Sequence, residues 1–237
     1  LSSDNSGAVL SLSDALTTVS SDNFSQKSAA KHTQNDRSGR GGETNYKYEY
    51  DPETGTHTIS FQRNVERPHF SKSVTYTLKY IFRDNNENFI EFPRRENERI
   101  ESINFNGQRE GNISTVRKES FFVRTDTFFI DGVSDASSIL RIDGVHNGEG
   151  AMKIDRPNQG LLERSYELEI NFLNIEIDKA IVESNGDLTE GVNGTLSWEM
   201  IITKSRNGQS ETKTVRGTIE MNGDGTALLR FERFQKL

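Results

Sequence analysis

Histidine is the side chain best suited to acid–base chemistry and metal binding near neutral pH, so its positions come first. The sequence of 237 residues has four histidines, His32, His57, His69 and His146. Each stands alone, and no two are four residues apart, which is the spacing that places two metal ligands on one face of a helix. We therefore interpret the four histidines as scattered strand or surface residues rather than as a metal centre.

Four acidic residues in neighbouring predicted turns are candidate metal ligands. They are Asp131, Asp135, Asp143 and Glu149. Turns at one end of a sheet would bring these oxygens together, and calcium prefers a shell of several oxygen ligands. No segment matches the calcium-binding loop of EF-hands, and Asp-Gly pairs are also common in ordinary turns. Calcium at these residues is the one cofactor that the sequence suggests; otherwise none is predicted.

Enzyme chemistry has no recognisable local motif in this sequence. There is no G-x-S-x-G elbow, no phosphate-binding loop, no dinucleotide fingerprint and no H-E-x-x-H. Paired carboxylates would serve glycoside hydrolysis. The 36 acidic residues guarantee candidate pairs in any fold, so their presence discriminates nothing. Cysteine is absent, which removes thiolate nucleophiles and thiolate metal ligands. We predict a non-enzymatic protein and name no catalytic residue.

Phenylalanine is plentiful, with 14 residues, and some of these rings would line a cavity for a small apolar ligand inside a curled sheet. The predicted lining residues are Phe121, Phe128, Phe172 and Leu196. The alternative is that the same side chains fill the interior as core. The single tryptophan, Trp198, alternates with Leu196 and Met200 on one apolar face, and we assign it to the core.

Alternating apolar and polar residues predict a series of antiparallel strands. The clearest run is 196–202, where every second residue is large and apolar. Asn207-Gly208 then predicts a tight hairpin, and Asn-Gly-Asp-Gly at 222–225 predicts another turn. The same alternation continues through 215–221 and 227–231. The segment is therefore an antiparallel meander with one face open to water.

Earlier segments repeat this pattern. Residues 46–50, 56–63 and 74–82 alternate with period two, and we predict that 89–92 returns as a further strand. A short strand is expected at 99–105, closed by a turn at Asn106-Gly107. After Phe172 the apolar register slips by one position, which predicts a β-bulge. Long bulged strands curl, so the predicted fold is all-β: a single antiparallel meander domain forming a curled sheet, a barrel or half-barrel, or a twisted sandwich.

The first 45 residues differ in composition from the rest of the chain. They are rich in Ser, Asp, Asn, Thr, Gly and Lys, a composition that does not bury enough apolar surface to fold alone. We divide the chain into an N-terminal arm, 1–45, and a β domain, 46–237. The arm resembles the tether of mature bacterial envelope lipoproteins, although the cysteine that would carry the lipid is not in this sequence. The first residue is Leu, which predicts a processed or trimmed product.

The charge balance restricts the classes of partner. A net charge of -7 argues against a nucleic-acid-binding protein, because binding to phosphates requires a basic surface. No apolar run approaches the roughly 20 residues of a membrane-spanning helix. The resemblance of the arm implies a periplasmic, cell-surface or extracellular location. Any membrane attachment would then act only through a tether outside this chain.

Three functional hypotheses follow. The leading one is a non-enzymatic envelope or extracellular binding or structural subunit, whose β domain and N-terminal arm contact another protein, with exposed edge strands as the natural contact. The second is a carrier of a small apolar ligand inside a curled sheet or barrel. The third is a membrane-spanning β-barrel, which needs an apolar outer band that the charged strands of this sequence do not supply.

Overall fold

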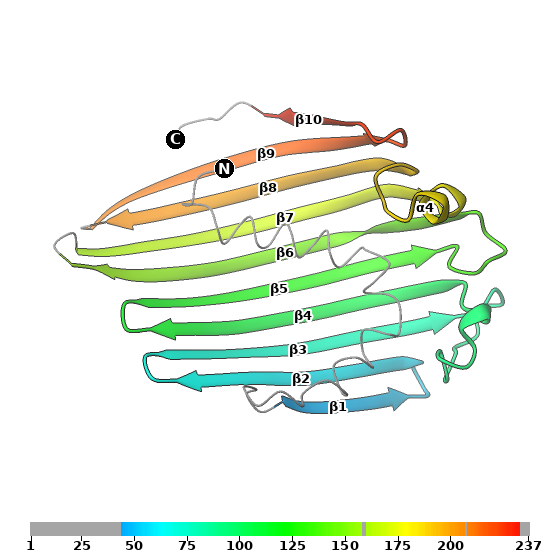
Figure 1. The fold of residues 1–237 in the computed structure, drawn as a ribbon, viewed down its shortest axis with the longest axis horizontal. Helices are drawn as coiled ribbons and strands as arrows, with labels where there is room; N and C mark the ends of the chain where they lie inside the picture. Colours follow the sequence, from blue (N-terminus) through cyan, green and yellow to red (C-terminus); the bar gives the residue numbers. More distant parts are fainter. Residues whose placement is uncertain (1–43, 158–159, 207, 233–237) are drawn as a thin grey trace.

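The computed structural model describes residues 44–157, 160–206 and 208–232, which form one antiparallel sheet of ten strands (Figure 1). The strands lie side by side in chain order, with β1 at one edge and β10 at the other. Their bounds are β1 (Thr44–Asp51), β2 (Thr56–Arg67), β3 (Phe70–Arg83), β4 (Ser102–Thr115), β5 (Lys118–Asp131), β6 (Ile139–Arg156), β7 (Gly160–Asp178), β8 (Val192–Arg206), β9 (Gln209–Asn222) and β10 (Ala227–Phe231). The predicted all-β meander is confirmed, as an open curled sheet that does not close into a barrel.

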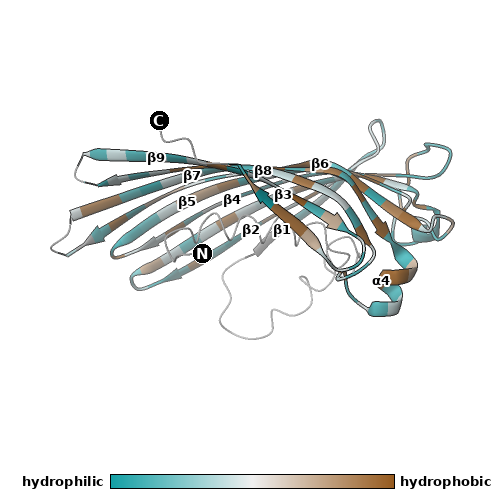
Figure 2. Ribbon diagram, turned by 90° about the horizontal axis from the view of Figure 1, so that it is seen from above, coloured by the Kyte–Doolittle hydropathy of each residue, from teal (hydrophilic) through white to brown (hydrophobic). Residues whose placement is uncertain are grey.

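Alternation along the strands gives the sheet two chemically different faces. On the face that we call the inner face, Phe105 of β4 stands opposite Phe128 of β5, and Phe172 of β7 stands opposite Leu196 of β8. The opposite, outer face carries mainly Thr, Ser, Asn, Gln and Glu side chains. Figure 2 shows the sheet nearly edge-on, with helix α4 (Lys179–Asn185) projecting from one side. Val182 of α4 packs against the core, so this side is the inner face.

The hydrophobic core lies on the inner face, at the end of the sheet near α4. Its rings pack closely: Phe128 lies edge-on to Phe172 with 5.0 Å between ring centres, and stacks with Phe105 at 6.3 Å. Burying one such side chain stabilises a fold by about 1.5–3 kcal/mol. The buried members are Ile90, Ile100, Ile103, Phe105, Phe128, Ile130, Ile142, Leu168, Ile170, Phe172, Ile175, Ile177 and Leu196. Two of them, Ile90 and Ile100, come from the β3–β4 connection rather than from the sheet.

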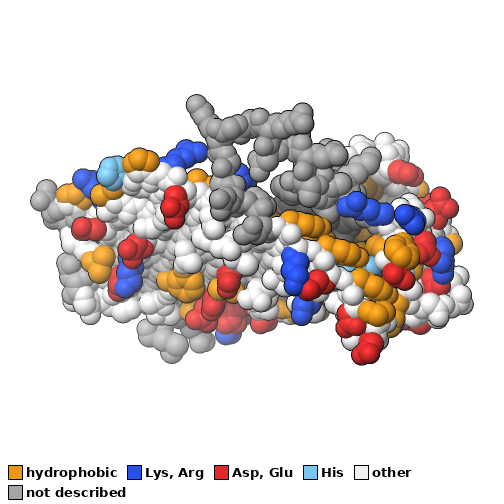
Figure 3. Space-filling view, turned by 90° about the horizontal axis from the view of Figure 1, so that it is seen from below, with side chains coloured by type: hydrophobic (Ala, Val, Ile, Leu, Met, Phe, Trp, Pro, Cys, Tyr) orange, Lys and Arg blue, Asp and Glu red, His pale blue; other side chains and the backbone are white. Residues whose placement is uncertain are grey.

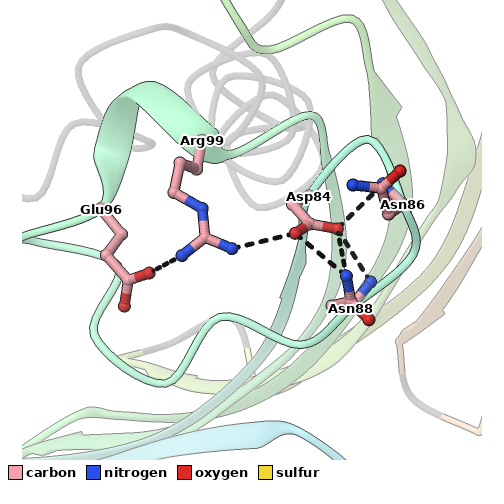
Figure 4. A network of polar contacts seen from close by, with 5 residues as sticks. All are labelled: Asp84, Asn86, Asn88, Glu96 and Arg99. Carbon is pink, nitrogen blue, oxygen red and sulfur yellow. Dashed lines mark hydrogen bonds and ion pairs between the residues drawn. The ribbon is translucent and has the colours of Figure 1, made fainter.

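A buried carboxylate, Asp84, organises the β3–β4 connection (Figure 4). It accepts hydrogen bonds from the backbone N–H groups of Asn86 and Asn88, both at 2.9 Å, and from Nη2 of Arg99 at 3.0 Å. Arg99 belongs to the short 3-10 helix η2 (Asn97–Arg99) and also contacts Glu96. These donors, first among them the backbone of Asn88, favour the charged carboxylate and lower the pKa of Asp84 to about 2. The network stabilises the conformation of the β3–β4 connection, whose Ile90 and Ile100 lie in the core.

Glycines on the inner face leave room for aromatic rings of the neighbouring strands. A Cβ atom at Gly150 would lie 2.7 Å from the ring of Tyr166, and one at Gly217 would lie 2.9 Å from the ring of Trp198. Both separations are too short for carbon atoms in contact. The rings therefore lie over the bare backbone of the next strand, which lets large side chains fit on a tightly paired sheet.

The predicted slip of register after Phe172 is present as a β-bulge in β7. Asn174, within the bulge, has φ of 49°, in the left-handed region. Its N–H donates to Oδ1 of Asp143 at 2.8 Å. Beyond the bulge Ile175 is buried, whereas Leu173 is 46% exposed. The extra residue thus returns the apolar positions of the strand to the inner face.

Three details of the predicted strands are wrong. The strand expected from Arg99 begins at Ser102, and Arg99 itself lies in η2. Asn106-Gly107 does not close this strand, because β4 continues to Thr115. A Cβ atom at Gly107 would lie 2.7 Å from the ring of Phe105, so this glycine serves ring packing rather than a turn. The predicted strand at 89–92 is reduced to an isolated bridge between Arg83 and Phe89.

Helix α4 was not predicted from the sequence. Asp178 caps its N-terminus, where its side chain accepts hydrogen bonds from the N–H groups of Ala180 at 3.0 Å and Ile181 at 3.1 Å. Gly186 ends it in the left-handed conformation, with its N–H donating to the carbonyl of Val182 at 2.8 Å. Seven residues are too few for a helical period to stand out from the surrounding strand pattern.

Candidate functional site

The four residues predicted to line a ligand cavity do not all share one face. Phe128, Phe172 and Leu196 lie on the inner face, and all three are buried members of the core. Phe121 lies on the outer face and is 45% exposed. Phe121 and Phe128 are seven positions apart, an odd number, in a strand whose pairing is regular, so their side chains point to opposite faces.

The four candidate calcium ligands are also spread out. Asp131 is the last residue of β5, and Asp135 lies in the connection to β6. Asp143 and Glu149 lie within β6 rather than in turns, six positions apart on the outer face, which corresponds to about 20 Å along a strand. In residues 44–157, 160–206 and 208–232, no group of three or more His, Cys, Asp or Glu side chains is arranged to hold a metal ion.

Two of the three histidines in the described residues, His57 and His146, are buried, and the first of them supports the fold. Nε2 of His57 donates to the carbonyl oxygen of Ile90 at 2.9 Å, so Nδ1 is the acceptor for the hydroxyl of Tyr48 at 2.8 Å. Burial lowers the pKa of His57. His69 is exposed in the β2–β3 turn, and His32 lies outside the described residues.

The second buried histidine, His146 on β6, is paired with a carboxylate. Its Nδ1 lies 2.6 Å from Oδ1 of Asp126, which stands directly opposite on β5. His146 is 1% exposed, and among the described residues its Nε2 has no hydrogen-bond partner. Burial raises the pKa of Tyr80 to about 12, and the charge of Asp126 contributes to that rise. A carboxylate-oriented imidazole offers Nε2 as an acceptor when neutral and as a donor when protonated.

Two arginines lie beside this pair on the same face. Arg109 of β4 stands directly opposite Arg124 of β5, and Arg124 is 7% exposed. The guanidinium carbon of Arg124 lies 4.8 Å from the centre of the Phe122 ring, and that of Arg109 lies 5.9 Å from the same ring. Arg109 also lies 5.6 Å from the ring centre of Tyr76. We call Arg109, Arg124, Asp126 and His146 the polar band.

The polar band belongs to a wider separation of charge between the two faces. The basic residues of the inner face are Arg63, Arg67, Lys72, Arg109, Lys118, Arg124, Arg164, Lys204, Arg206 and Lys213. In the described strands, the acidic residues of that face are Asp126 and Glu211. The outer face carries the larger acidic set, which includes Glu110, Glu119, Glu149, Glu163, Glu167, Glu169, Glu176, Glu199 and Glu220. A net charge of -7 therefore conceals a basic inner face.

The polar band was not predicted from the sequence. The net charge of the whole chain averages the two faces and hides the difference between them. A usable signal was present, because Arg109 follows Phe105 by four positions and Arg124 precedes Phe128 by four. An even separation within one strand places each arginine on the same face as the core phenylalanine.

The two edges of the sheet are exposed in different ways. On the β1 side, seen in Figure 3, hydrophobic side chains gather among charged ones. Tyr46 and Tyr48 of β1 are 45% and 49% exposed, and Lys47 forms an ion pair with Glu49. At the other edge, β10 exposes Leu228, Leu229 and Phe231 at 45%, 49% and 60%.

No protein-family model, curated protein or solved structure matches this chain. Within the described part of the chain, no helix is long and apolar enough to cross a membrane.

Proposed function

We propose that this chain is a non-enzymatic binding protein that recruits a second polypeptide by adding an extended strand of that partner to the β9–β10 edge. One observation supports the proposal. β10 pairs only with residues 217–221 of β9, so the outer edge of β9 from Gln209 to Val215 has no partner strand among the described residues. Alternate residues along such an edge direct backbone N–H and C=O groups outward, ready for another strand.

The side chains at this edge favour a partner strand with apolar residues. Natural proteins usually protect edge strands with charged residues, and β1 follows that rule with Lys47 and Glu49. β10 instead presents Leu229 and Phe231 on the inner side, and its one charge, Arg230, is paired with Glu220 of β9. A strand laid along β9 would bury these apolar groups in addition to forming a backbone ladder.

The resemblance of residues 1–45 to an envelope tether supports placing this interaction in the periplasm, at the cell surface or outside the cell. In that setting the sheet is the recognition element and the arm is the attachment to a larger assembly.

Site-specific photo-crosslinking tests the proposal on the complete chain in its native source. A photoreactive residue replaces Thr212, exposed at the outer edge of β9, or, as the matched control, Asn106, exposed in the middle of the outer face. We expect one discrete cross-linked species from the Thr212 position and none from Asn106. The Leu229→Lys and Phe231→Lys double variant should abolish that species.

Hydrogen exchange provides the second measurement. Amides of residues 209–215 should become protected in the complex, whereas those of β1 should not change. Equal cross-linking from both positions, or edge amides that exchange at the same rate with and without the bound species, would contradict strand addition.

A further inference from the structure

The described residues outside the strands cover the inner face of the sheet at one end only. The segments that pack on the core are the β3–β4 connection, the β5–β6 connection and α4, and all three lie at the same end of the sheet (Figure 1). Towards the hairpins at the opposite end, apolar side chains of the inner face such as Met152, Ile154 and Ile202 are only half-buried. An apolar face of a sheet is normally covered by a second layer. This part of the inner face therefore fits an additional segment.

The same part of the inner face carries basic side chains. Arg63, Arg67, Lys72 and Lys118 lie on it towards the hairpins, and the first three are exposed. A second copy of this face would bring like charges together, which disfavours a face-to-face dimer. A segment that is both apolar and acidic is complementary to the face.

The chain carries such a segment before β1. Residues 1–26 contain three Asp and no Lys or Arg, whereas residues 27–43 contain four Lys or Arg and two acidic residues. Residues 8–24, which we call the docking segment, contain the large apolar residues Val9, Leu10, Leu12, Leu16, Val19 and Phe24, and residues 27–43 contain none. Composition therefore divides the arm into an acidic, apolar part and a polar connector.

We propose that the docking segment lies on the inner face, between the core and the hairpins, and forms a second layer there. Its large apolar side chains cover half-buried groups of β8 such as Trp198 and Met200. Its two acidic residues, Asp14 and Asp22, lie among the basic side chains of the face. Burial of apolar surface supplies the attraction, and complementary charge selects this face over the acidic outer face. The docking site is separate from the outer edge of β9 and does not depend on strand addition there.

The connector has the length that this position requires. Leu16 lies 28 positions before Thr44, the first residue of β1. A flexible polar chain of that length spans about 26–32 Å on average. β8 lies seven strand spacings from β1, which is about 34 Å along a flat sheet and less along a curled one. Because the average span is close to this distance, the tethered segment has a high effective concentration at the inner face.

Contact between the docking segment and Trp198 tests the proposal on the complete chain. The sequence has no cysteine, so Ser13→Cys provides a single attachment point for a bimane dye, whose fluorescence a tryptophan quenches on contact. We expect the dye at position 13 to be quenched in the native protein, and the further substitution Trp198→Phe to restore its fluorescence. The quenching should not depend on protein concentration, because the contact lies within one chain.

A matched dye position serves as the control. Ser38 lies six positions before Thr44, so a dye on Ser38→Cys reaches at most about 20 Å from the start of β1 and cannot contact Trp198. This dye should keep its full fluorescence.

Variants of the arm test the two kinds of interaction separately. The Leu12→Asp and Leu16→Asp double variant should lose the quenching, because unpaired charges are not buried on an apolar face. The Asp14→Asn and Asp22→Asn double variant should lose part of it at low salt. Its control removes two acidic residues from the connector instead, at Asp36 and Glu43, and should leave the quenching unchanged. Circular dichroism verifies that the β domain is folded in each case.

The outcomes separate the docking segment from other occupants. Equal fluorescence at positions 13 and 38, or quenching that Trp198→Phe leaves unchanged, would overturn the proposal. Quenching that rises with protein concentration would also overturn it, because the contact would then come from a second copy of the chain. If Trp198→Phe does not fold, the Leu12→Asp and Leu16→Asp double variant, which changes only the arm, carries the comparison.

Discussion

The two ends of the inner face are built from different side chains on the same strands. Near α4, β4 and β5 present Phe105 and Phe128, which pack in the core. Four positions further along each strand, towards the β4–β5 hairpin, the same two strands present Arg109 and Arg124. The backbone pairing is continuous from one end to the other.

The two ends of the inner face therefore contribute differently to the protein. The core end gains stability from burial and is closed by the β3–β4 connection and α4. The polar band instead places charged and polar groups, Arg109, Arg124, Asp126 and His146, on strands whose other ends carry core rings.

The largest expected effect comes from removing a core ring. Phe128→Ala should lower the free energy of unfolding by about 3–5 kcal/mol, because it leaves a cavity between Phe105 and Phe172. The matched control is the next residue, Phe129, which is 44% exposed on the outer face. Phe129→Ala should cost less than about 1 kcal/mol. Denaturant titration followed by circular dichroism measures both, and equal losses would refute the assignment of the faces.

Removing the Asp84 carboxylate, which holds the β3–β4 connection together, should have the next largest effect on stability. Asp84→Asn removes the charged acceptor for the N–H of Asn88 and for Arg99, so the thermal midpoint should fall by several degrees at neutral pH. The pKa of Asp84 is lowered from 3.8 to about 2, so its contribution is present above pH 4 and is lost as the pH falls towards 2. The difference between wild type and variant should therefore shrink over that range. Asp187→Asn, at an exposed turn, is the control and should change the midpoint less.

His57, which is hydrogen-bonded to Ile90 of the β3–β4 connection, should make a smaller contribution to the pH dependence of the free energy of unfolding. Burial lowers its pKa below the ordinary 6.5, so protonation favours the unfolded chain. The stability that neutral His57 contributes is present above pH 6.5 and is lost as the pH falls below that value. His57→Gln keeps a donor for Ile90 and an acceptor for Tyr48 but does not titrate. Between pH 7.5 and 5.5 its unfolding free energy should fall less than that of the wild type, and parallel curves for the two proteins would exclude this role.

The smallest expected effect comes from the polar band. Arg109→Gln removes the cation–π contacts with the rings of Tyr76 and Phe122 and should lower the free energy of unfolding by about 0.5–1 kcal/mol. Arg141→Gln, which breaks an exposed outer-face ion pair with Glu176, is the control and should lower it less. Denaturant titration measures both variants, and equal losses would contradict a stabilising role of the two rings at Arg109.

The strand pattern was predictable from the sequence wherever one side of a strand is apolar. The alternation around Trp198 and the slip after Phe172 both correspond to observed features, since side-chain direction follows directly from residue parity. Asn106-Gly107 was misread because a glycine that makes room for a ring has the same local sequence as a glycine in a turn. The packing of Phe105 over that glycine distinguishes the two cases and is not visible in sequence.

The polar band required the register between strands, which local patterns do not contain. Asp126 and His146 are 20 positions apart, and only the pairing of β5 with β6 brings them face to face. The same is true of Arg109 and Arg124, whose opposition depends on the length of the β4–β5 hairpin. In contrast, the four proposed calcium ligands were grouped by closeness in sequence, and their positions along β5 and β6 keep them apart.

The chain-order arrangement of the ten strands also bears on how the sheet assembles and how it can change. Every ladder joins two consecutive strands, so no pairing requires closure of a loop longer than one connection, and the entropy cost of each step is small. Growth from any hairpin outwards is therefore a series of similar short-range steps. Adding or removing a hairpin at an edge leaves every other ladder intact, so the width of this sheet can vary without rethreading the chain.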